Sequence, residues 1–372
     1  MSMRAVAVRP GEPGSAHIRD ARRPRIEDVE DGTGALVRVL RVGVDGTDLE
    51  IVDGEYGAAP DGDDHLILGH ESLGRVEDVG PKAPEWLRPG SLVVATVRRP
   101  GGSIYDRLGM QDVTTDEDVL ERGINRLHGF LAEWYVDAAA YLVRLPDSLE
   151  PVGVLVEPMS IAQKALRQAF EIQRRLRIWR PQRAAVLGAG TIGLLAALAM
   201  RLRGLDVTVF SRREPPYLAS ELVVAIGGRY VGSQRIGFEA LAGRDGPFDL
   251  VVEATGYSPL AFEAPLGLAR NGVLVLASVT GGDRTAEVAT DRVNQRLVLG
   301  NGVIVGTVNA AREDFVEGVE DLLRAEAFHP GWLGRMLTTR IDGLEQYEEM
   351  LRRLREDEDA IKVYVDVAGA AS

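Results

Sequence analysis

The chain contains no cysteine among its 372 residues. This absence excludes disulfide bonds, thiolate metal ligands and thiol nucleophiles, although it says nothing direct about the cellular compartment. Lysine is scarce as well: only Lys82, Lys164 and Lys362 are present, and arginine carries nearly all the positive charge. Acidic residues outnumber basic ones and give a net charge of −13, which disfavours nucleic acid and anionic membranes as partners.

Long apolar runs are also lacking. The longest apolar stretch, residues 184–200, contains three glycines and is better explained as a strand, turn and helix than as a membrane span. The first residues enter a strand pattern without the apolar core of a signal peptide, and no repeat or low-complexity tract is visible. The apolar content of 45% argues against disorder, and 372 residues are enough for two domains. With no signal peptide or membrane span in the pattern, we expect a cytoplasmic protein.

Two sequence patterns divide the chain. Residues 1–153 contain short β-patterned runs broken by Gly, Pro and Asp. Residues 154–308 alternate regularly between strand and helix patterns, which predicts an α/β domain with a doubly wound parallel sheet and helices on both faces. A strand expected over residues 361–367 returns the chain to the first domain. The prediction is therefore one domain of residues 1–153 and 309–372, with a second domain inserted into it. Within residues 154–308 we expect strands at 184–187, 207–210, 248–253, 272–277 and 302–305, and helices at 191–203, 218–226, 259–269 and 291–299.

A glycine-rich turn follows the first strand of the inserted domain and begins a helix. This context is the one that a dinucleotide-binding fingerprint requires. The first glycine permits a tight turn, the second allows the backbone to approach a pyrophosphate, and the third lets helix and strand pack closely. The helix N-terminus supplies free N–H groups to the phosphates. The candidate cofactor residues of this turn are Gly188, Ala189, Gly190, Thr191, Ile192 and Gly193.

The end of the second strand indicates which cofactor is preferred. A site specific for NAD places Asp or Glu there to hold the ribose hydroxyls. This chain has Ser211, Arg212 and Arg213 instead, and two guanidinium groups suit the 2′-phosphate of NADP. Glu214 follows two or three residues too late for the NAD role, although its charge repels a phosphate in part. We predict that NADP is preferred and NAD tolerated.

Further motifs carry a resemblance that covers nearly the whole chain. Gly43-Val-Asp-Gly-Thr-Asp48, Gly69-His-Glu71 and Glu253-Ala-Thr-Gly256 are similar to segments of the medium-chain, zinc-dependent alcohol dehydrogenase superfamily. Those proteins usually have cysteine where this chain has Asp45. The narrower resemblance is to the archaeal-type glucose 1-dehydrogenases, and it is carried by segments such as Thr96-Val-Arg-Arg-Pro100, Leu155-Val-Glu-Pro-Met159 and Val305-Gly-Thr-Val-Asn309. It implies that the inserted Rossmann domain interrupts a β-rich, GroES-like catalytic domain.

The resemblance also implies a metal site and a sugar site. Asp45, His70 and Glu157 match direct ligands of one catalytic Zn²⁺, and Glu71 matches a nearby carboxylate that ligates directly or through water. Oxygen and imidazole ligands suit zinc at roughly 2.0–2.2 Å, whereas Mg²⁺ or Mn²⁺ gain less from imidazole. A second, structural zinc is not expected, because residues 98–125 lack the four cysteines that hold it in relatives.

The implied reaction is oxidation of C1 of an aldose, with D-glucose as the expected substrate, to a lactone with hydride transfer to the nicotinamide. Thr47 matches the hydroxyl that relays the proton, and Thr255 matches a cofactor residue. The substrate set is Glu71, Glu121, Glu157 and Asn309, of which Asn309 also lies near the nicotinamide. The adjacent Asp48 is expected to make structural hydrogen bonds, and His128 is equally well explained as lining the cleft or as a core residue.

Two other functions remain compatible with the sequence. One is a metal-free reductase of the quinone or enoyl type, which the complete set of His70, Glu71 and Glu157 disfavours. The other is a non-catalytic NADPH-binding protein in which Asp45 marks a decayed site. The resemblance further implies a homodimer or homotetramer formed through the last strand of the nucleotide domain, here residues 302–305.

Overall fold

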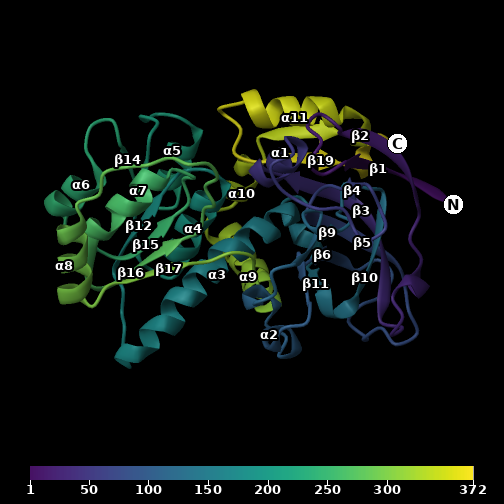
Figure 1. Ribbon diagram of the computed structural model, residues 1–372, viewed down its shortest axis with the longest axis horizontal. Helices are drawn as coiled ribbons and strands as arrows, with labels where there is room; N and C mark the ends of the chain where they lie inside the picture. Colours follow the sequence, from purple (N-terminus) through teal and green to yellow (C-terminus); the bar gives the residue numbers. More distant parts are fainter. Residues whose placement is uncertain (372) are drawn as a thin grey trace. The chain divides into compact units, whose positions relative to one another are not determined.

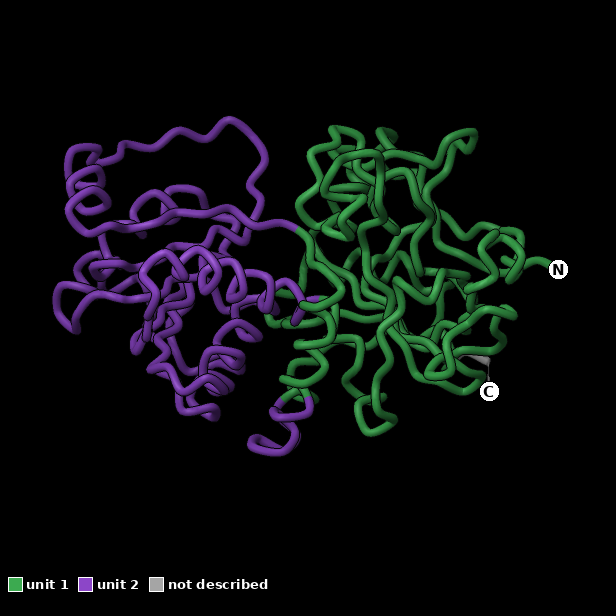
Figure 2. The backbone as a smooth tube through the Cα atoms, turned by 90° about the horizontal axis from the view of Figure 1, so that it is seen from below, with its two compact units in different colours: residues 1–157, 309–322, 333–372 green, residues 158–308, 323–332 purple. Residues whose placement is uncertain are grey.

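The computed structural model describes residues 1–371, and these divide into two compact units (Figures 1 and 2). The first unit comprises residues 1–157, 309–322 and 333–372, and the second comprises residues 158–308 and 323–332. The sequence-based boundary at 153/154 thus lies four residues before the structural one. Residues 323–332 fall in the second unit, although the sequence pattern placed them with the first. Within residues 1–371, no helix is long and apolar enough to cross a membrane.

The first unit is built from β-sheets whose strands are mostly antiparallel. Its largest sheet has seven strands in the order β11-β6-β5-β3-β19-β18, with β10 also paired to β3. Two three-stranded sheets, β2-β1-β4 and β7-β8-β9, complete the set. The strands are β1 (Ser2–Val8), β2 (His17–Arg22), β3 (Gly34–Val44), β4 (Leu66–Ile67), β5 (Glu71–Val79), β6 (Leu92–Ala95), β7 (Arg98–Arg99), β8 (Leu120–Arg122), β9 (Arg126–Leu127), β10 (Trp134–Ala138), β11 (Leu142–Leu145), β18 (Thr339–Asp342) and β19 (Val363–Asp366).

The C-terminal strand closes this sheet. β19 pairs antiparallel with the end of β3, so that Val363 lies opposite Val44. The predicted return of residues 361–367 to the first unit is therefore correct. Helices of this unit are short except for α9 and α11; their bounds are α1 (Gly46–Val52), α2 (Ile104–Arg107), α9 (Arg312–Phe328), α10 (Trp332–Met336) and α11 (Tyr347–Glu356), with α9 and α10 shared with the second unit.

A six-stranded parallel sheet forms the core of the second unit, in the order β14-β13-β12-β15-β16-β17 (Figure 1). Its strands are β12 (Arg183–Leu187), β13 (Asp206–Ser211), β14 (Arg229–Gly232), β15 (Phe248–Glu253), β16 (Leu268–Leu276) and β17 (Val303–Gly306). The helices are α3 (Val156–Gln173), α4 (Thr191–Leu202), α5 (Leu218–Ala225), α6 (Phe238–Asp245), α7 (Ser258–Glu263) and α8 (Thr290–Gly300). The strand order reverses beside β12, where such sheets bind ligands at the carboxyl ends of their strands.

The largest departure from the predicted elements lies between β15 and β16. The helix expected over residues 259–269 ends at Glu263, and β16 already begins at Leu268. A single helical turn of residues 264–267 covers the gap, and its apolar residues are buried against the core rather than arranged on a helix face. β14 and α6 were not predicted, because β14 has only four residues and is half exposed.

The core of the second unit depends on stacked aromatic rings. Phe238 lies 5.4 Å from Phe248 and 5.6 Å from Phe210 between ring centroids, and all three are buried.

Phe238→Ala is therefore expected to lower the free energy of unfolding by about 3–5 kcal/mol, because it leaves a cavity. Phe262→Ala is the matched control, since that ring is 57% exposed and its loss costs less than about 0.5 kcal/mol. Urea unfolding followed by circular dichroism measures both; equal losses would contradict the packing argument.

Candidate active site

The junction of β3 and α1 places the first candidate metal ligand. Asp45 is the N-cap of α1, and its Oδ1 accepts a hydrogen bond from the Thr47 backbone N–H at 2.8 Å. Asp48 completes a capping box by accepting from the Asp45 N–H at 3.1 Å. It also accepts from the Gly69 N–H at 3.2 Å, so the fully buried Asp48 ties α1 to the segment that carries His70. Asp48 thus makes the structural hydrogen bonds expected of it.

His70 and Glu71 enter from the start of β5, and Glu157 enters from the first turn of α3. Two overlapping groups of possible ligand atoms result, Asp45 with Asp48 and His70, and His70 with Glu71 and Glu157; within each group the atoms lie within 4.8 Å of one another. His70 belongs to both groups. The structure therefore brings together the residues that the sequence analysis assigned to the metal, and Thr47 lies beside them in α1.

A lysine that the sequence analysis did not assign completes the cluster. The ammonium group of Lys362 forms a buried salt bridge with the Glu71 carboxylate and donates to the Val44 carbonyl at 3.2 Å. Lys362 is only 2% exposed, and it precedes β19 where that strand pairs with the end of β3. Gly43 makes room for this pair, because a Cβ there would collide with both side chains. The sequence feature that could have drawn attention to Lys362 is the scarcity of lysine, of which the chain has three.

Burial and mutual repulsion shift the pKa values of the whole cluster. Burial raises the pKa of Asp48 to about 6 and that of Glu157 to about 8. Burial alone would lower the pKa of His70, but Asp45, Asp48 and the two glutamates outweigh it and raise the value to about 9. Burial also opposes ionisation of Asp45, yet His70 and Lys362 hold its pKa below the usual range. Without a metal, the cluster therefore retains protons at neutral pH.

The donor set fits a divalent cation. His70 Nε2 and Asp45 Oδ2 are 3.8 Å apart, too far for a hydrogen bond, whereas two atoms bound to one zinc ion at roughly 2.0–2.2 Å each lie within about 4.4 Å of one another. His70 Nδ1 is buried and has no hydrogen-bond partner. When ionised, Asp45, Asp48, Glu71 and Glu157 carry four negative charges, of which Lys362 balances one. A dication offsets two of the remaining three.

The candidate sugar residues form a second buried group. Glu121 Oε1 accepts from Arg98 Nε at 3.1 Å and Nη2 at 2.7 Å, and from Asn309 Nδ2 at 2.8 Å. Glu121 and Arg98 are 3% and 7% exposed. Glu121 is therefore not a surface residue, and its partner Arg98 was missed because a lone arginine in an arginine-rich chain gives no signal. Asn309 adopts φ of 60°, a left-handed conformation that asparagine tolerates.

The segment that lacks the cysteines of relatives is ordered by its own polar side chains. Asp106 accepts from the N–H and hydroxyl of Ser103 and from the Thr114 hydroxyl, at 2.7–3.0 Å. Asp116 accepts from the N–H of Gly102 and from that of Ser103. These carboxylates fold residues 101–116 around α2. They provide by hydrogen bonds the order that a metal ion supplies in a cysteine-containing lobe.

The dinucleotide fingerprint has the predicted geometry within the second unit. Gly188 follows β12 with φ of 107°, and Gly190 is the N-cap of α4, whose first residues are Thr191, Ile192 and Gly193. A Cβ at Gly193 would collide with the Gly188 carbonyl, which is the close packing of helix and strand that the third glycine permits. Ala189 occupies the turn between them. Ser211 ends the neighbouring β13, and Thr255 follows β15, where its N–H donates to buried Glu253 at 2.7 Å.

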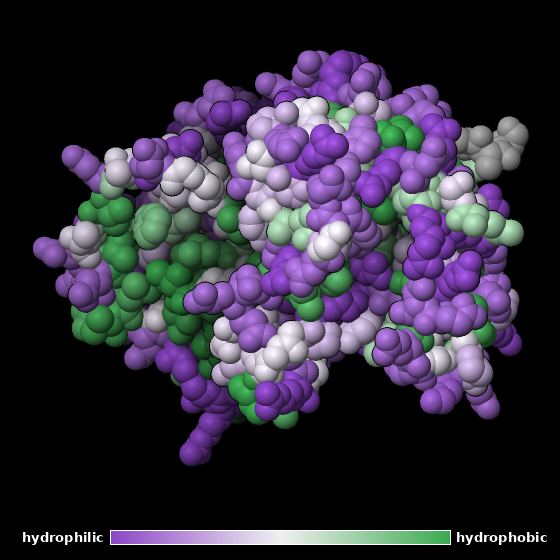
Figure 3. Space-filling view, turned by 45° about the vertical axis from the view of Figure 1, so that its right-hand side comes forward, coloured by the Kyte–Doolittle hydropathy of each residue, from purple (hydrophilic) through white to green (hydrophobic). Residues whose placement is uncertain are grey.

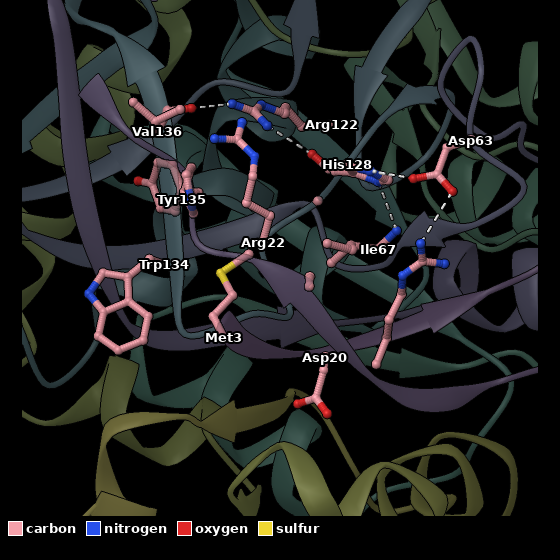
Figure 4. A pocket seen from close by; sticks show the side chains of 14 residues that line it. Met3, Asp20, Arg22, Asp63, Ile67, Arg122, His128, Trp134, Tyr135 and Val136 are labelled. Carbon is pink, nitrogen blue, oxygen red and sulfur yellow. Dashed lines mark hydrogen bonds and ion pairs between the residues drawn. The ribbon is translucent and has the colours of Figure 1, made fainter. Parts of the chain in front are cut away.

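A cavity of about 430 Å³ in the first unit lies apart from this chemistry (Figure 4). His128 lines it, with Nδ1 accepting from the Ile67 N–H and Nε2 3.3 Å from Asp63, as the dashed lines show. Burial lowers the pKa of His128. Asp63, Asp64 and His65 are grouped closely enough to hold a cation, but Arg19 already lies 3.6 Å from Asp63 and 3.8 Å from Asp64. His128 thus has structural partners outside the metal cluster.

Zinc affinity is expected to rise with pH between about pH 6 and pH 9. The metal-free protein holds protons on His70 and Glu157, with pKa values of about 9 and 8, and zinc binds only the deprotonated groups. For each proton that zinc displaces, the dissociation constant of zinc falls about tenfold for every unit by which the pH rises, as long as the pH is below the pKa of that group. Competition with a chromophoric chelator at several pH values measures this slope, and a pH-independent affinity would contradict the protonated cluster.

Lys362→Met is expected to destabilise the metal-free protein by about 3–5 kcal/mol, because it leaves the buried Glu71 carboxylate without its cation. Added zinc restores more stability to this variant than to the parent chain, since the ion supplies the missing positive charge. Thermal unfolding with and without zinc measures both effects. Lys82→Met, at an exposed lysine, is the control. Equal zinc-induced shifts in all three proteins would refute the role of Lys362.

Comparison with known proteins agrees with this geometry. Residues 150–367 match the family described as glucose dehydrogenase C-terminus, and residues 31–147 match the alcohol dehydrogenase GroES-like domain. A glucose 1-dehydrogenase of Methanocella arvoryzae is 43% identical over 98% of this chain and 99% of its own length. A glucose 1-dehydrogenase 1 of Haloterrigena turkmenica is 40% identical over 93% of both chains.

A solved structure shows the same likeness. The glucose dehydrogenase of Haloferax mediterranei, in complex with NADP, zinc and gluconolactone, superposes with a TM-score of 0.85 at 33% identity over 98% of this chain and 99% of that one. The α/β fold class, with a parallel sheet and a GroES-like domain, agrees with the prediction. The chain belongs to the glucose dehydrogenase branch of the medium-chain alcohol dehydrogenase superfamily.

Proposed function

We propose that this protein is a zinc-dependent glucose 1-dehydrogenase that oxidises C1 of D-glucose to gluconolactone and prefers NADP over NAD. The observation that carries the proposal is that His70 is shared by two groups of possible metal ligands, one with Asp45 and Asp48 and one with the buried Glu71 and Glu157, whose negative charge a dication offsets. The Haloferax enzyme with the same fold binds NADP, zinc and gluconolactone. Burying these carboxylates is unfavourable without a cation, and neither a metal-free reductase nor a non-catalytic NADPH-binding protein requires such a cluster.

Asp45, His70 and Glu157 are the residues that would hold the metal, with Glu71 as a carboxylate that can join or leave. Zinc in such a site acts as a Lewis acid on an alcohol and lowers its pKa. Thr47, whose N–H donates to Asp45 at 2.8 Å, is placed beside the metal ligands to take the hydroxyl proton outward. Lys362 forms a buried salt bridge with Glu71 and so favours its ionised form, although burial raises the pKa of this carboxyl.

Glu121 and Asn309 are proposed to orient the sugar. A sugar hydroxyl donates to a carboxylate, and Arg98 keeps that carboxylate in one position by two charge-assisted hydrogen bonds. A site that hydrogen-bonds each hydroxyl rejects sugars that lack one, because its own polar groups are then left unpaired. The cofactor assignment rests on Gly188–Gly193, on Ser211, Arg212 and Arg213 after β13, and on Thr255 after β15.

The proposal includes a dimer or tetramer formed through β17. This strand is the edge of the six-stranded sheet, where unpaired backbone groups favour pairing with a second copy. Ile304 on β17 and Val298 and Leu299 on α8 are 41%, 67% and 61% exposed. Figure 3 shows apolar residues gathered on the left of the molecule, in the second unit. Light scattering of the purified protein tests the assembly.

A panel of sugars with both cofactors tests the function. We expect reduction of NADP⁺ by glucose, weaker reduction of NAD⁺, and little activity with a simple alcohol. A chelator abolishes the activity and added zinc restores it, because the metal activates the C1 hydroxyl. Sugars other than glucose, such as galactose and xylose, define the substrate range. Activity that survives complete removal of metal would refute the proposal.

Arg98→Gln is expected to lower kcat/KM for glucose about tenfold to a hundredfold, mainly through KM. Glu121 loses charge-assisted hydrogen bonds worth about 1.5–3 kcal/mol and no longer holds one position for the sugar. Arg107→Gln, at an exposed residue of the neighbouring α2, is the control and leaves the kinetics unchanged. Steady-state kinetics at saturating NADP⁺ measure both variants; an unchanged KM in Arg98→Gln would contradict the role of this pair.

A further inference from the structure

The ends of β13 and β14 lie side by side in the nucleotide-binding unit. Ser211 pairs with Gly232 in parallel register, and the Ser233 N–H donates to the Ser211 carbonyl at 2.8 Å. β13 ends at Ser211 and is followed by Arg212 and Arg213, and the segment after β14 carries Arg235. Because ligands of such sheets bind beyond the carboxyl ends of the strands, both segments border the adenosine end of a bound dinucleotide.

Glu214 returns to this corner although it lies three residues beyond β13. Its carboxylate lies against Gly232, where a Cβ would collide with both carboxylate oxygens. Its Oε1 is buried without a hydrogen-bond partner, and its Oε2 lies 3.1 Å from Nε of Arg235. The structure thus places an acidic group at the end of β14, whose last residue pairs with Ser211 at the end of the second strand. An acid at that point normally binds the ribose hydroxyls of NAD and repels a 2′-phosphate.

The neighbouring side chains are fixed in a different way. The Arg213 guanidinium lies 4.4 Å from the ring centroid of Tyr217, and the Tyr230 hydroxyl donates to the Arg213 carbonyl at 2.7 Å. The two tyrosine hydroxyls are 2.7 Å apart. Burial raises the pKa of Tyr230, so its hydroxyl stays protonated as a donor. Arg213 therefore contacts the Tyr217 ring and accepts a hydrogen bond from Tyr230, whereas the carboxylate of Glu214 pairs with the guanidinium of Arg235.

We propose that Arg235 is a specificity-determining residue that neutralises and seats Glu214 against Gly232, and thereby permits this corner to accept the 2′-phosphate of NADP. The inference rests on the proposed function, since it concerns the same cofactor. Arg235 acts through Glu214: without it, the carboxylate is free to face the phosphate or to take the ribose hydroxyls of NAD. The side chain of Arg235 is 80% exposed, so its replacement leaves the fold intact.

A double-mutant cycle in cofactor binding tests the inference without any measurement of activity. Calorimetric titration of NADP⁺ and NAD⁺ is carried out on the parent protein and on Arg235→Gln, Glu214→Gln and the double variant. Arg235→Gln is expected to weaken NADP⁺ binding about tenfold and NAD⁺ binding less than about twofold, because only NADP carries the extra charge. The double variant returns NADP⁺ affinity to within about threefold of the parent, since the repelling carboxylate is gone.

Gly232→Ala supplies an independent route to the same state, because its Cβ displaces the Glu214 carboxylate while Arg235 remains; it too weakens NADP⁺ selectively. Arg244→Gln, at an exposed arginine paired with Asp245, is the control and changes neither affinity. If Arg235→Gln leaves NADP⁺ affinity unchanged, or the double variant binds as weakly as Arg235→Gln, the inference is wrong. If the parent protein itself does not prefer NADP⁺, the cofactor assignment fails instead, and the two failures are thus distinguishable.

Discussion

A buried pair of opposite charges, Lys362 with Glu71, is the constraint on which the metal cluster depends. Four carboxylates and one imidazole meet in the first unit, and burying so many acids is unfavourable unless cations accompany them. Lys362 supplies a permanent positive charge beside the protonated His70, and the pairing of β19, which begins at the next residue, brings it from the far end of the sequence to the end of β3. The pairing of β19 with β3 is therefore an electrostatic requirement as well as a structural one.

The same cluster shows what an aspartate at position 45 does that a cysteine does not. Asp45 uses one carboxylate oxygen to cap α1 and presents the other toward His70. A thiolate has no such second oxygen, so the substitution fastens the ligand to the helix that follows it. When no dication is present, the neighbouring carboxylates raise the pKa of His70, and burial raises that of Glu157.

Elsewhere in the chain, arginine pairs with carboxylates as Lys362 pairs with Glu71. Arg98 fixes the carboxylate of Glu121 in the proposed sugar site, and Arg235 contacts that of Glu214 in the nucleotide-binding unit. The two pairs differ in burial, and so they differ in consequence. The Arg98 pair is almost fully buried and holds one geometry, whereas the Arg235 pair borders solvent and is weak enough for its loss to redirect a carboxylate.

The sequence by itself determined the features that depend on local pattern. The glycine-rich turn of residues 188–193, the alternation of strands and helices and the ligand motifs around Asp45 and His70 are short-range signals, because turn geometry and periodicity act over a few residues. Tertiary structure alone decided the partners that are distant in the chain. Lys362 beside Glu71, Arg98 beside Glu121 and the return of Glu214 to Gly232 depend on which strands become neighbours, and no local pattern encodes that pairing. Charge balance in a buried site is a sum over such neighbours, so it is visible only once the chain has folded.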